Sequence, residues 1–228
     1  MIVIKSTALR KVLKIFIPCV LIPAAIIFGE TVLEGKRYAA VSLIAAILAL
    51  VLFIAGVERK KSGSRRLVIT AIMTALAVLG RFIPVFKPVT AVAVMSGMYL
   101  GKEAGFLTGA ISALISNFYF GQGPWTPFQM LSWGIIGYFA GVIQVLLKKN
   151  KGFLAVYGTI AGIVYSLIMD VWTVLWYSGG VSLELYLAAM VTALPHTALY
   201  AVSNVVFLLA MSKPFGSRME RIKIKYGI

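Results

Sequence analysis

Long apolar runs, separated by short polar or basic stretches, dominate the pattern of residues along this chain. Eight runs are suited to helices: 15–33, 38–57, 67–83, 89–100, 104–118, 128–147, 153–172 and 185–211. About 20 helical residues cross a hydrocarbon core of about 30 Å. The pattern therefore predicts an all-α polytopic membrane protein with eight transmembrane helices. The fourth run is short, so we expect it to lie obliquely or to end below the surface, packed against protein.

Composition supports this class and limits the alternatives. Of the 228 residues, 61% are hydrophobic and 13% are charged, which leaves no room for a sizeable soluble domain beside eight spans. No phosphate-binding G-x-x-x-x-G-K-[ST] loop is present, so any energy from ATP must come from a partner. The single cysteine, Cys19, lies in an apolar run and excludes a disulfide framework.

The basic residues cluster between the apolar runs, and this distribution predicts an orientation. The formal charge is +15, but clusters of this kind orient a membrane protein rather than bind nucleic acid. Of the 22 Lys and Arg residues, 18 fall on the side that holds both chain ends. The four on the other side are Lys36, Arg37, Arg81 and Lys87. We therefore expect a multi-pass protein of the cell membrane with both termini in the cytoplasm.

A basic run at residues 58–66 is the clearest internal boundary in the chain. Two apolar runs precede it and six follow it. The sequence therefore predicts an N-terminal two-helix transmembrane extension over residues 1–60 and a six-helix membrane domain over residues 61–228.

The segment between the fifth and sixth runs, residues 118–130, has the most unusual composition. It combines two glycines and two prolines with five aromatic residues and two glutamines. Glycine and proline favour a defined, non-helical backbone, while aromatic faces beside amides suit a large, uncharged, partly aromatic solute. An interfacial aromatic belt is the alternative interpretation. The candidate substrate-binding residues of this segment are Tyr119, Gln122, Trp125, Thr126 and Gln129.

Two other connections fall on the same predicted outer side. Arg81 and Lys87 lie in the connection after the third run, where they either bind an anionic group of the solute or snorkel to the headgroups. Trp176 lies in the connection between the last two runs, whose aromatic and glycine content suits a mobile lid.

Polar residues inside the spans are further candidates. Asp170 needs a wet cavity or a partner such as Arg81, because an unpaired carboxylate is costly in a membrane. Asn117 and His196 either contact the ligand or hydrogen-bond between helices. No metal-ligand spacing or catalytic motif accompanies them, so we expect no metal, no cofactor and no enzyme. A self-contained secondary transporter of a small organic solute, with Asp170 coupling an ion, remains the alternative.

Small residues recur at a spacing of four near the predicted inner side. Ala71 and Ala75 share one helix face and allow another helix to come close. A row of glycines with the same spacing either packs helices together or leaves room for a bulky solute. Its members are Gly97, Gly101, Gly105 and Gly109.

From about residue 65 to residue 228 the chain resembles the S component of energy-coupling factor (ECF) vitamin transporters. The resemblance rests on a basic start before Ala71 and Ala75, on six hydrophobic helices, and on the loop Phe-Gly-Gln-Gly-Pro-Trp-Thr-Pro-Phe-Gln. The loop looks like that of S components for cobalamin or related corrinoids. The resemblance implies a six-helix bundle with an outward-facing vitamin site, closed by the loops after the first and third core helices.

The same resemblance implies partners for the chain. Ala71 and Ala75 would dock on the coupling helices of a transmembrane T component that carries two ATPase subunits. The S component would then topple in the lipid bilayer and release its vitamin inside. Cobalamin or cobinamide is the first expectation for the substrate, a different vitamin is the alternative, and nucleic acid is not expected as a partner. The leading two helices depart from the six-helix pattern.

Overall fold

Helices make up every regular element in the residues that the structure, a computed structural model, describes, which are 4, 6–33, 37–57 and 60–226. In chain order they are α1 (Thr7–Phe16), the π-helical turn η1 (Ile17–Leu21), α2 (Ile22–Thr31), α3 (Tyr38–Ala55), α4 (Lys60–Gly80), α5 (Val89–Leu100), α6 (Lys102–Phe120), α7 (Trp125–Val142), α8 (Gln144–Lys149), α9 (Lys151–Ser178) and α10 (Leu183–Tyr226). The all-α prediction is confirmed. Pro18 and Pro23 lie at the starts of η1 and α2, where a missing backbone N–H explains the widened turn between α1 and α2.

Within the described residues, five helical segments are long and apolar enough to cross a membrane. They are Thr7–Thr31, Tyr38–Ala55, Gly63–Gly80, Lys151–Ser178 and Leu183–Ile222. The apolar α5 is shorter, as its pattern predicts. The chain is therefore a multi-pass membrane protein.

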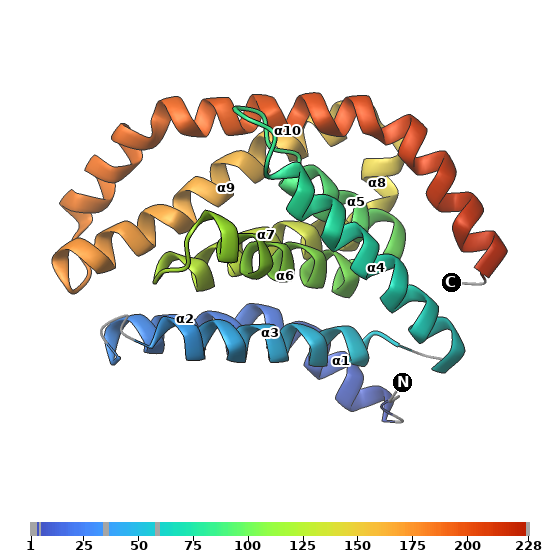
Figure 1. The fold of residues 1–228 in the computed structure, drawn as a ribbon, viewed down its shortest axis with the longest axis horizontal. Helices are drawn as coiled ribbons and strands as arrows, with labels where there is room; N and C mark the ends of the chain where they lie inside the picture. Colours follow the sequence, from blue (N-terminus) through green and yellow to red (C-terminus); the bar gives the residue numbers. More distant parts are fainter. Residues whose placement is uncertain (1–3, 5, 34–36, 58–59, 227–228) are drawn as a thin grey trace.

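The helices are arranged around a central group formed by α5, α6 and α7. The hairpin of α1, η1, α2 and α3 lies along one side of α6 and α7, and α10 arches along the opposite side, over α9 and α5 (Figure 1). All 12 residues of α5 are buried. A short helix can therefore sit in the middle of the bundle without facing lipid along its length.

Glycines bring the three central helices into backbone contact. A Cβ atom on Gly97 would lie 2.1 Å from the carbonyl oxygen of Gly137, and one on Gly105 would lie 2.2 Å from the same atom. A Cβ atom on Gly109 would lie 2.3 Å from the carbonyl oxygen of Trp133. The α7 backbone thus lies against three of the four glycines of the row, so these glycines pack helices and leave no space there for a bulky solute.

Several predicted helix boundaries differ from the structure. The first helix begins at Thr7, eight residues before its predicted start, and the predicted run 128–147 is divided at Ile143 into α7 and α8. α4 begins at Lys60, so most of the basic run at 58–66 is helical, and α10 continues to Tyr226, beyond the predicted end at residue 211. Lys and Arg are good helix formers, so a basic cluster marks where a helix leaves the membrane and not where it ends. Among the charged residues used to predict orientation and the boundary, Lys5, Lys36, Glu58 and Arg59 lie outside the described residues.

The two ends of the bundle differ in character. The connections after α4, α6 and α9, residues 81–88, 121–124 and 179–182, are at one end, which we call the loop end. The other end, called the basic end, carries the start of α1 and the turn between α5 and α6. Gly101 makes that turn with φ +96°, and a Cβ atom there would lie 2.7 Å from the guanidinium of Arg66.

An ionic network joins the hairpin to the core at the basic end. Buried Glu103 of α6 accepts a hydrogen bond from Arg66 of α4 at 2.9 Å and pairs with Lys14 of α1 at 3.4 Å. Arg66 also donates to the carbonyl of Gly56, and Arg10 donates to that of Ala55, both just after or at the end of α3. One carboxylate therefore connects α1, α4 and α6.

Candidate functional site

Arg81 anchors a polar cluster under the loop end. It follows the last turn of α4, and its guanidinium donates hydrogen bonds to Ser116 Oγ at 2.6 Å and to Asn117 Oδ1 on α6. Its Cζ atom lies 4.8 Å from the ring centre of Phe120 and 5.3 Å from that of Trp133. Burial lowers the pKa of Arg81 below its ordinary value.

Amides extend the cluster from α6 to α9. Asn117 Nδ2 donates to Thr126 Oγ1 at 2.8 Å and to Gln129 Oε1 at 2.9 Å, both on α7. Gln129 Nε2 in turn donates to the hydroxyl of Tyr165 on α9 at 3.3 Å. The Asn117, Thr126 and Gln129 side chains are all buried, so each polar group is held by a neighbour and not by bulk water.

Four stacked rings from three helices lie next to these amides. The ring centres of Trp133 and Tyr165 are 5.3 Å apart, those of Tyr165 and Tyr200 are 4.7 Å apart, and those of Tyr200 and His196 are 5.6 Å apart. The interplanar angles are 20°, 24° and 19°. Trp133 Nε1 donates to the Tyr200 hydroxyl at 3.1 Å, so these aromatic side chains combine flat faces with hydrogen-bonding edges.

We call these residues the aromatic–amide cluster: Arg81, Ser116, Asn117, Thr126, Gln129, Trp133, Tyr165, His196 and Tyr200. Parallel ring faces recognise a planar conjugated molecule, and amides can pair with carbonyl and N–H groups along its edge. The arrangement therefore suits binding of a heteroaromatic solute.

A second cation lies beside the cluster. Lys87 Nζ is 5.7 Å from the ring centre of Phe120, the same ring that Arg81 contacts. Burial, and then the nearby Arg81, lower the pKa of Lys87 below its ordinary value. No carboxylate among the described residues pairs with Arg81 or Lys87. The loop end therefore offers positive charge to an incoming ligand.

Aromatic side chains from the connection 81–88 and from the last turn of α6 cover the loop end beside Arg81. Phe82 lies 4.6 Å from Tyr119 and 5.0 Å from Phe120, measured between ring centres. Phe82 and Tyr119 are largely exposed, at 47% and 73%. Because both rings are exposed, Phe82 and Tyr119 can move apart with little loss of buried apolar area. Such a movement is what a lid over a binding site requires.

Two of the predicted loop residues build the turn between α6 and α7. Gln122 Nε2 donates to the carbonyl of Leu114 at 2.9 Å, and Thr126 Oγ1 donates to Gln122 Oε1 at 3.0 Å. Gly121, with φ +102°, ends α6 in a conformation that favours glycine. The side-chain amide of Gln122 and the hydroxyl of Thr126 therefore stabilise the turn itself.

Other predicted site residues lie away from the cluster. Trp125 packs edge-on against Trp172 at 5.7 Å, and Trp172 stacks on Trp176 at 6.4 Å, which forms a separate row of indoles. Asp170 lines a groove between α9 and α10 and does not pair with Arg81. The expected Arg81–Asp170 contact is therefore absent, because Arg81 is held by Ser116 and Asn117 of α6.

Sequence reasoning missed four members of the cluster: Ser116, Trp133, Tyr165 and Tyr200. The three aromatic residues lie in the middle of apolar runs, where they resemble ordinary core residues. The signal that could have identified them is the polar group of each ring, because a buried Tyr or Trp needs a hydrogen-bonding partner. Each of the three aromatic residues lies in a different apolar run.

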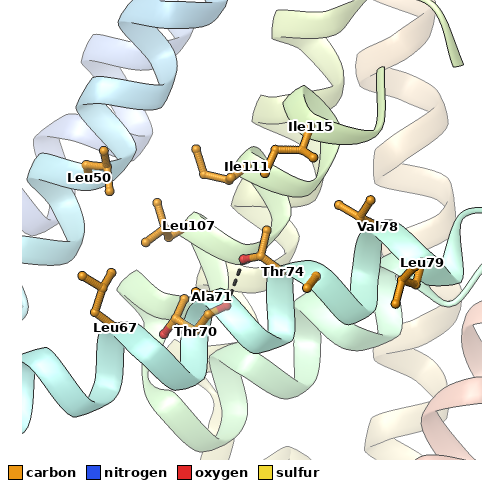
Figure 2. Close-up of a pocket in the computed structure, with 11 residues that line it drawn as sticks. Leu50, Leu67, Thr70, Ala71, Thr74, Val78, Leu79, Leu107, Ile111 and Ile115 are labelled. Atoms are coloured by element: carbon orange, nitrogen blue, oxygen red, sulfur yellow. Dashed lines mark hydrogen bonds between the residues drawn. The ribbon is translucent and has the colours of Figure 1, made fainter. Parts of the chain in front are cut away.

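A different surface surrounds the predicted alanine pair. A groove of about 540 Å³ lies between α4, α6 and α3, and Figure 2 shows Ala71 and Thr74 of α4, with Leu107 and Ile111 of α6 across from them. Leu50 contributes a wall from α3.

The alanine pair is accessible on this surface. Ala71 and Ala75 are exposed, and the Thr74 hydroxyl donates a hydrogen bond to the carbonyl of Thr70 at 2.9 Å. We call this surface the alanine groove.

The groove has the properties of a contact surface for a membrane helix. Its side chains are aliphatic apart from two threonines, and the hydroxyls of both are bonded within α4. Small residues at a spacing of four allow the backbone of another helix to approach. Among the described residues, no group of three or more His, Cys, Asp or Glu side chains could hold a metal ion.

Comparison with known protein families gives one match. The family model described as the S component of the ECF-type riboflavin transporter matches residues 61–214. The matched region begins in the first turn of α4 and ends within α10, and so contains the aromatic–amide cluster and the alanine pair. Comparisons with curated proteins and with solved structures gave no match.

Proposed function

The chain belongs to the family of ECF-type riboflavin transporter S components, and on this basis we propose that it binds a flavin, with riboflavin as the substrate, at the aromatic–amide cluster. S components are the substrate-binding membrane subunits of vitamin transporters, so the chain is a transport subunit and not an enzyme. S components work with a T component and ATPase subunits.

The stacked rings beside buried amides are the observation that supports a flavin most strongly. A flavin is a planar three-ring system with carbonyl and N–H groups along one edge and a hydroxylated chain on the other side. The faces of Trp133, Tyr165 and Tyr200 match the ring system, and the amides of Asn117 and Gln129 match its polar edge. Family and geometry thus favour the same class of ligand.

A corrinoid is supported less well. In the loop motif that resembles corrinoid-binding S components, both ends of the Gln122 amide are hydrogen-bonded within the protein. In the glycine row that would make space for so large a ligand, three of the four glycines lie against the α7 backbone. Cobalamin and cobinamide are therefore the competing ligands in the experiment below.

We further propose that substrate reaches the cluster from outside the cell. This orientation places both termini and the basic end in the cytoplasm, in agreement with the distribution of Lys and Arg. Connections 81–88 and 121–124 would then form the lid, with Phe82 and Tyr119 separating as the flavin enters.

The alanine groove is the proposed docking surface for the T component. A coupling helix of that subunit would lie against Ala71 and Ala75, whose small, exposed side chains allow another helix to approach the α4 backbone. The groove and the cluster share α4 and α6, because Arg81 follows α4 and Asn117 belongs to α6. A change in the relative position of α4 and α6 would thus couple ligand binding to docking of the T component.

Titration of site variants with riboflavin tests the proposal. Gln129→Leu removes an amide from the cluster and should weaken riboflavin binding about tenfold, the loss expected for about one hydrogen bond to the ligand. Asn204→Leu is the matched control, because Asn204 is also a buried amide and donates to the carbonyl of Gly158 elsewhere. Flavin fluorescence quenching gives both affinities. Equal affinity for the two variants would place the site elsewhere.

A further inference from the structure

A groove between α9 and α10 contains a buried carboxylate that the proposed function does not use. The cavity has a volume of about 350 Å³ and is lined by Asp170, whose side chain is only 7% exposed. Ser166 and Thr197, also in the lining, share a hydrogen bond of 2.7 Å between their hydroxyls. The remaining walls are aliphatic or methionine side chains.

Asp170 has no partner of its own among the described residues. No hydrogen bond or ion pair reaches its carboxylate, and the nearby Tyr186 hydroxyl is donated to the carbonyl of Leu167. Arg81, the expected partner, is bound to α6. An intramembrane carboxylate without a cation is costly, so the groove is complementary to a positively charged group.

The setting of the groove indicates where such a group comes from. Leu187, Val191 and Leu194 on its rim are 53%, 66% and 60% exposed, so the groove faces the lipid. Asp170 lies eight residues, about 12 Å, before the end of α9 at Ser178. α9 is about 42 Å long, against a hydrocarbon core of about 30 Å, which puts Asp170 near the headgroup boundary at the loop end.

The chemistry of the groove favours a lipid as its occupant. Apart from the Ser166–Thr197 hydroxyl pair, its walls are aliphatic or methionine side chains around a single carboxylate. An acyl chain can follow the apolar walls. An ammonium at the top of that chain would meet the carboxylate and, unlike a quaternary amine, would donate hydrogen bonds to it.

We propose that this groove binds a membrane lipid with a primary ammonium headgroup, of the phosphatidylethanolamine type, whose ammonium pairs with Asp170. The site is separate from the aromatic–amide cluster and does not depend on the identity of the vitamin. The lipid would cover the gap between α9 and α10 and neutralise the buried charge.

Competitive lipid retention tests the proposal on the full chain. The purified protein is mixed with equal amounts of phosphatidylethanolamine, its monomethyl and dimethyl derivatives, and phosphatidylcholine of the same acyl chains, and retained lipid is measured by native mass spectrometry. We expect at least tenfold more phosphatidylethanolamine than phosphatidylcholine, with retention falling as methyl groups are added. Equal retention of the four lipids by the wild-type protein overturns the proposal.

Two variants assign the effect to the carboxylate. Asp170→Asn should abolish the preference, while Asp170→Glu, which keeps the charge, should retain most of it. Glu184→Gln, which alters an exposed carboxylate at the start of α10, is the control and should leave the preference unchanged. A preference that survives in Asp170→Asn, or disappears in Glu184→Gln, assigns the lipid to another surface and contradicts the proposal.

Discussion

At the scale of single residues, Arg81 and Lys87 set the charge at the proposed binding site. Both contact Phe120, and no described carboxylate pairs with either. A flavin that carries a phosphate should therefore bind more tightly than riboflavin, by about fivefold at low salt, which corresponds to about 1 kcal/mol for a partly exposed ion pair. Titration of the protein with flavin mononucleotide and riboflavin measures the ratio.

Lys87→Gln removes one of the two cations, so it should lower that ratio and leave riboflavin affinity nearly unchanged. Burial and the nearby Arg81 lower the pKa of Lys87, so Lys87 loses its proton at a lower pH than an ordinary lysine. As the pH is raised, the preference for flavin mononucleotide over riboflavin should therefore disappear earlier than it would with an ordinary lysine. A ratio that is the same in the variant and the wild-type protein would show that Lys87 faces the headgroups instead.

The residues of the cluster differ in how far sequence could predict them. Arg81, Asn117, Gln129 and His196 are polar groups in apolar surroundings or in an unusual loop, so composition alone singles them out. Trp133 and Tyr200 are 67 residues apart and look like core positions until the fold brings their polar tips to 3.1 Å. Contacts between distant helices are the information that local pattern does not contain.

At the scale of helices, the exposed face of α4 carries the proposed docking function. Ala71→Trp should abolish copurification with the T component and leave riboflavin affinity unchanged, because a bulky side chain in the groove holds the partner helix away. Leu76→Trp is the control, since Leu76 is exposed on α4 but does not line the groove. Intact assembly of the Ala71 variant would place docking on another face.

Glu103 links the N-terminal hairpin to the core through its ion pair with Lys14. Glu103→Gln leaves Arg66 and Lys14 without their carboxylate, and we expect a loss of about 2–3 kcal/mol in stability, at the lower end for a buried pair because both cations are partly exposed. Glu220→Gln breaks a pair with Lys148 that is half exposed, and should cost no more than about 0.5 kcal/mol.

Unfolding of the two variants in detergent, followed by circular dichroism, compares these losses. Limited proteolysis adds a local readout, since a loosened hairpin should be cut sooner in the Glu103 variant. Equal stability of the two variants would mean that apolar packing of α3 on α6 and α7, and not the ionic network, attaches the hairpin.

The apolar runs predicted the helices better than they predicted the helix ends. Each of the eight runs lies mostly in helical residues, yet α10 continues to Tyr226 and α4 begins at Lys60, inside basic segments. Charge ends the apolar signal but does not end a helix, because Lys and Arg are compatible with helical structure in water. The sequence also could not show whether the glycine row packs helices or leaves room for a solute. That became clear only from the position of α7 in the fold.

At the scale of the whole molecule, the chain divides into parts with separate tasks. The aromatic–amide cluster is under the loop end, the alanine groove lies along α3, α4 and α6, and an ionic network joins the hairpin to the core at the basic end. The proposed binding and docking surfaces are thus on different faces of one bundle. The motor belongs to the partner subunits of the ECF transporter.

A ligand that binds only the folded protein should stabilise this bundle as a unit. Riboflavin at 100 times its dissociation constant should raise the stability by about 2.7 kcal/mol and increase the thermal midpoint accordingly. The Gln129→Leu variant at the same riboflavin concentration should gain about half as much. A midpoint that does not respond to riboflavin in the wild-type protein would contradict specific binding.

The most direct test of the account is calorimetric titration of the purified, folded wild-type chain with riboflavin and, in parallel, with cobalamin and cobinamide. We predict saturable binding of one equivalent of riboflavin and no saturable binding of either corrinoid. Saturable binding of a corrinoid, with none of riboflavin, would contradict the flavin assignment and return the loop between α6 and α7 to the centre of the site.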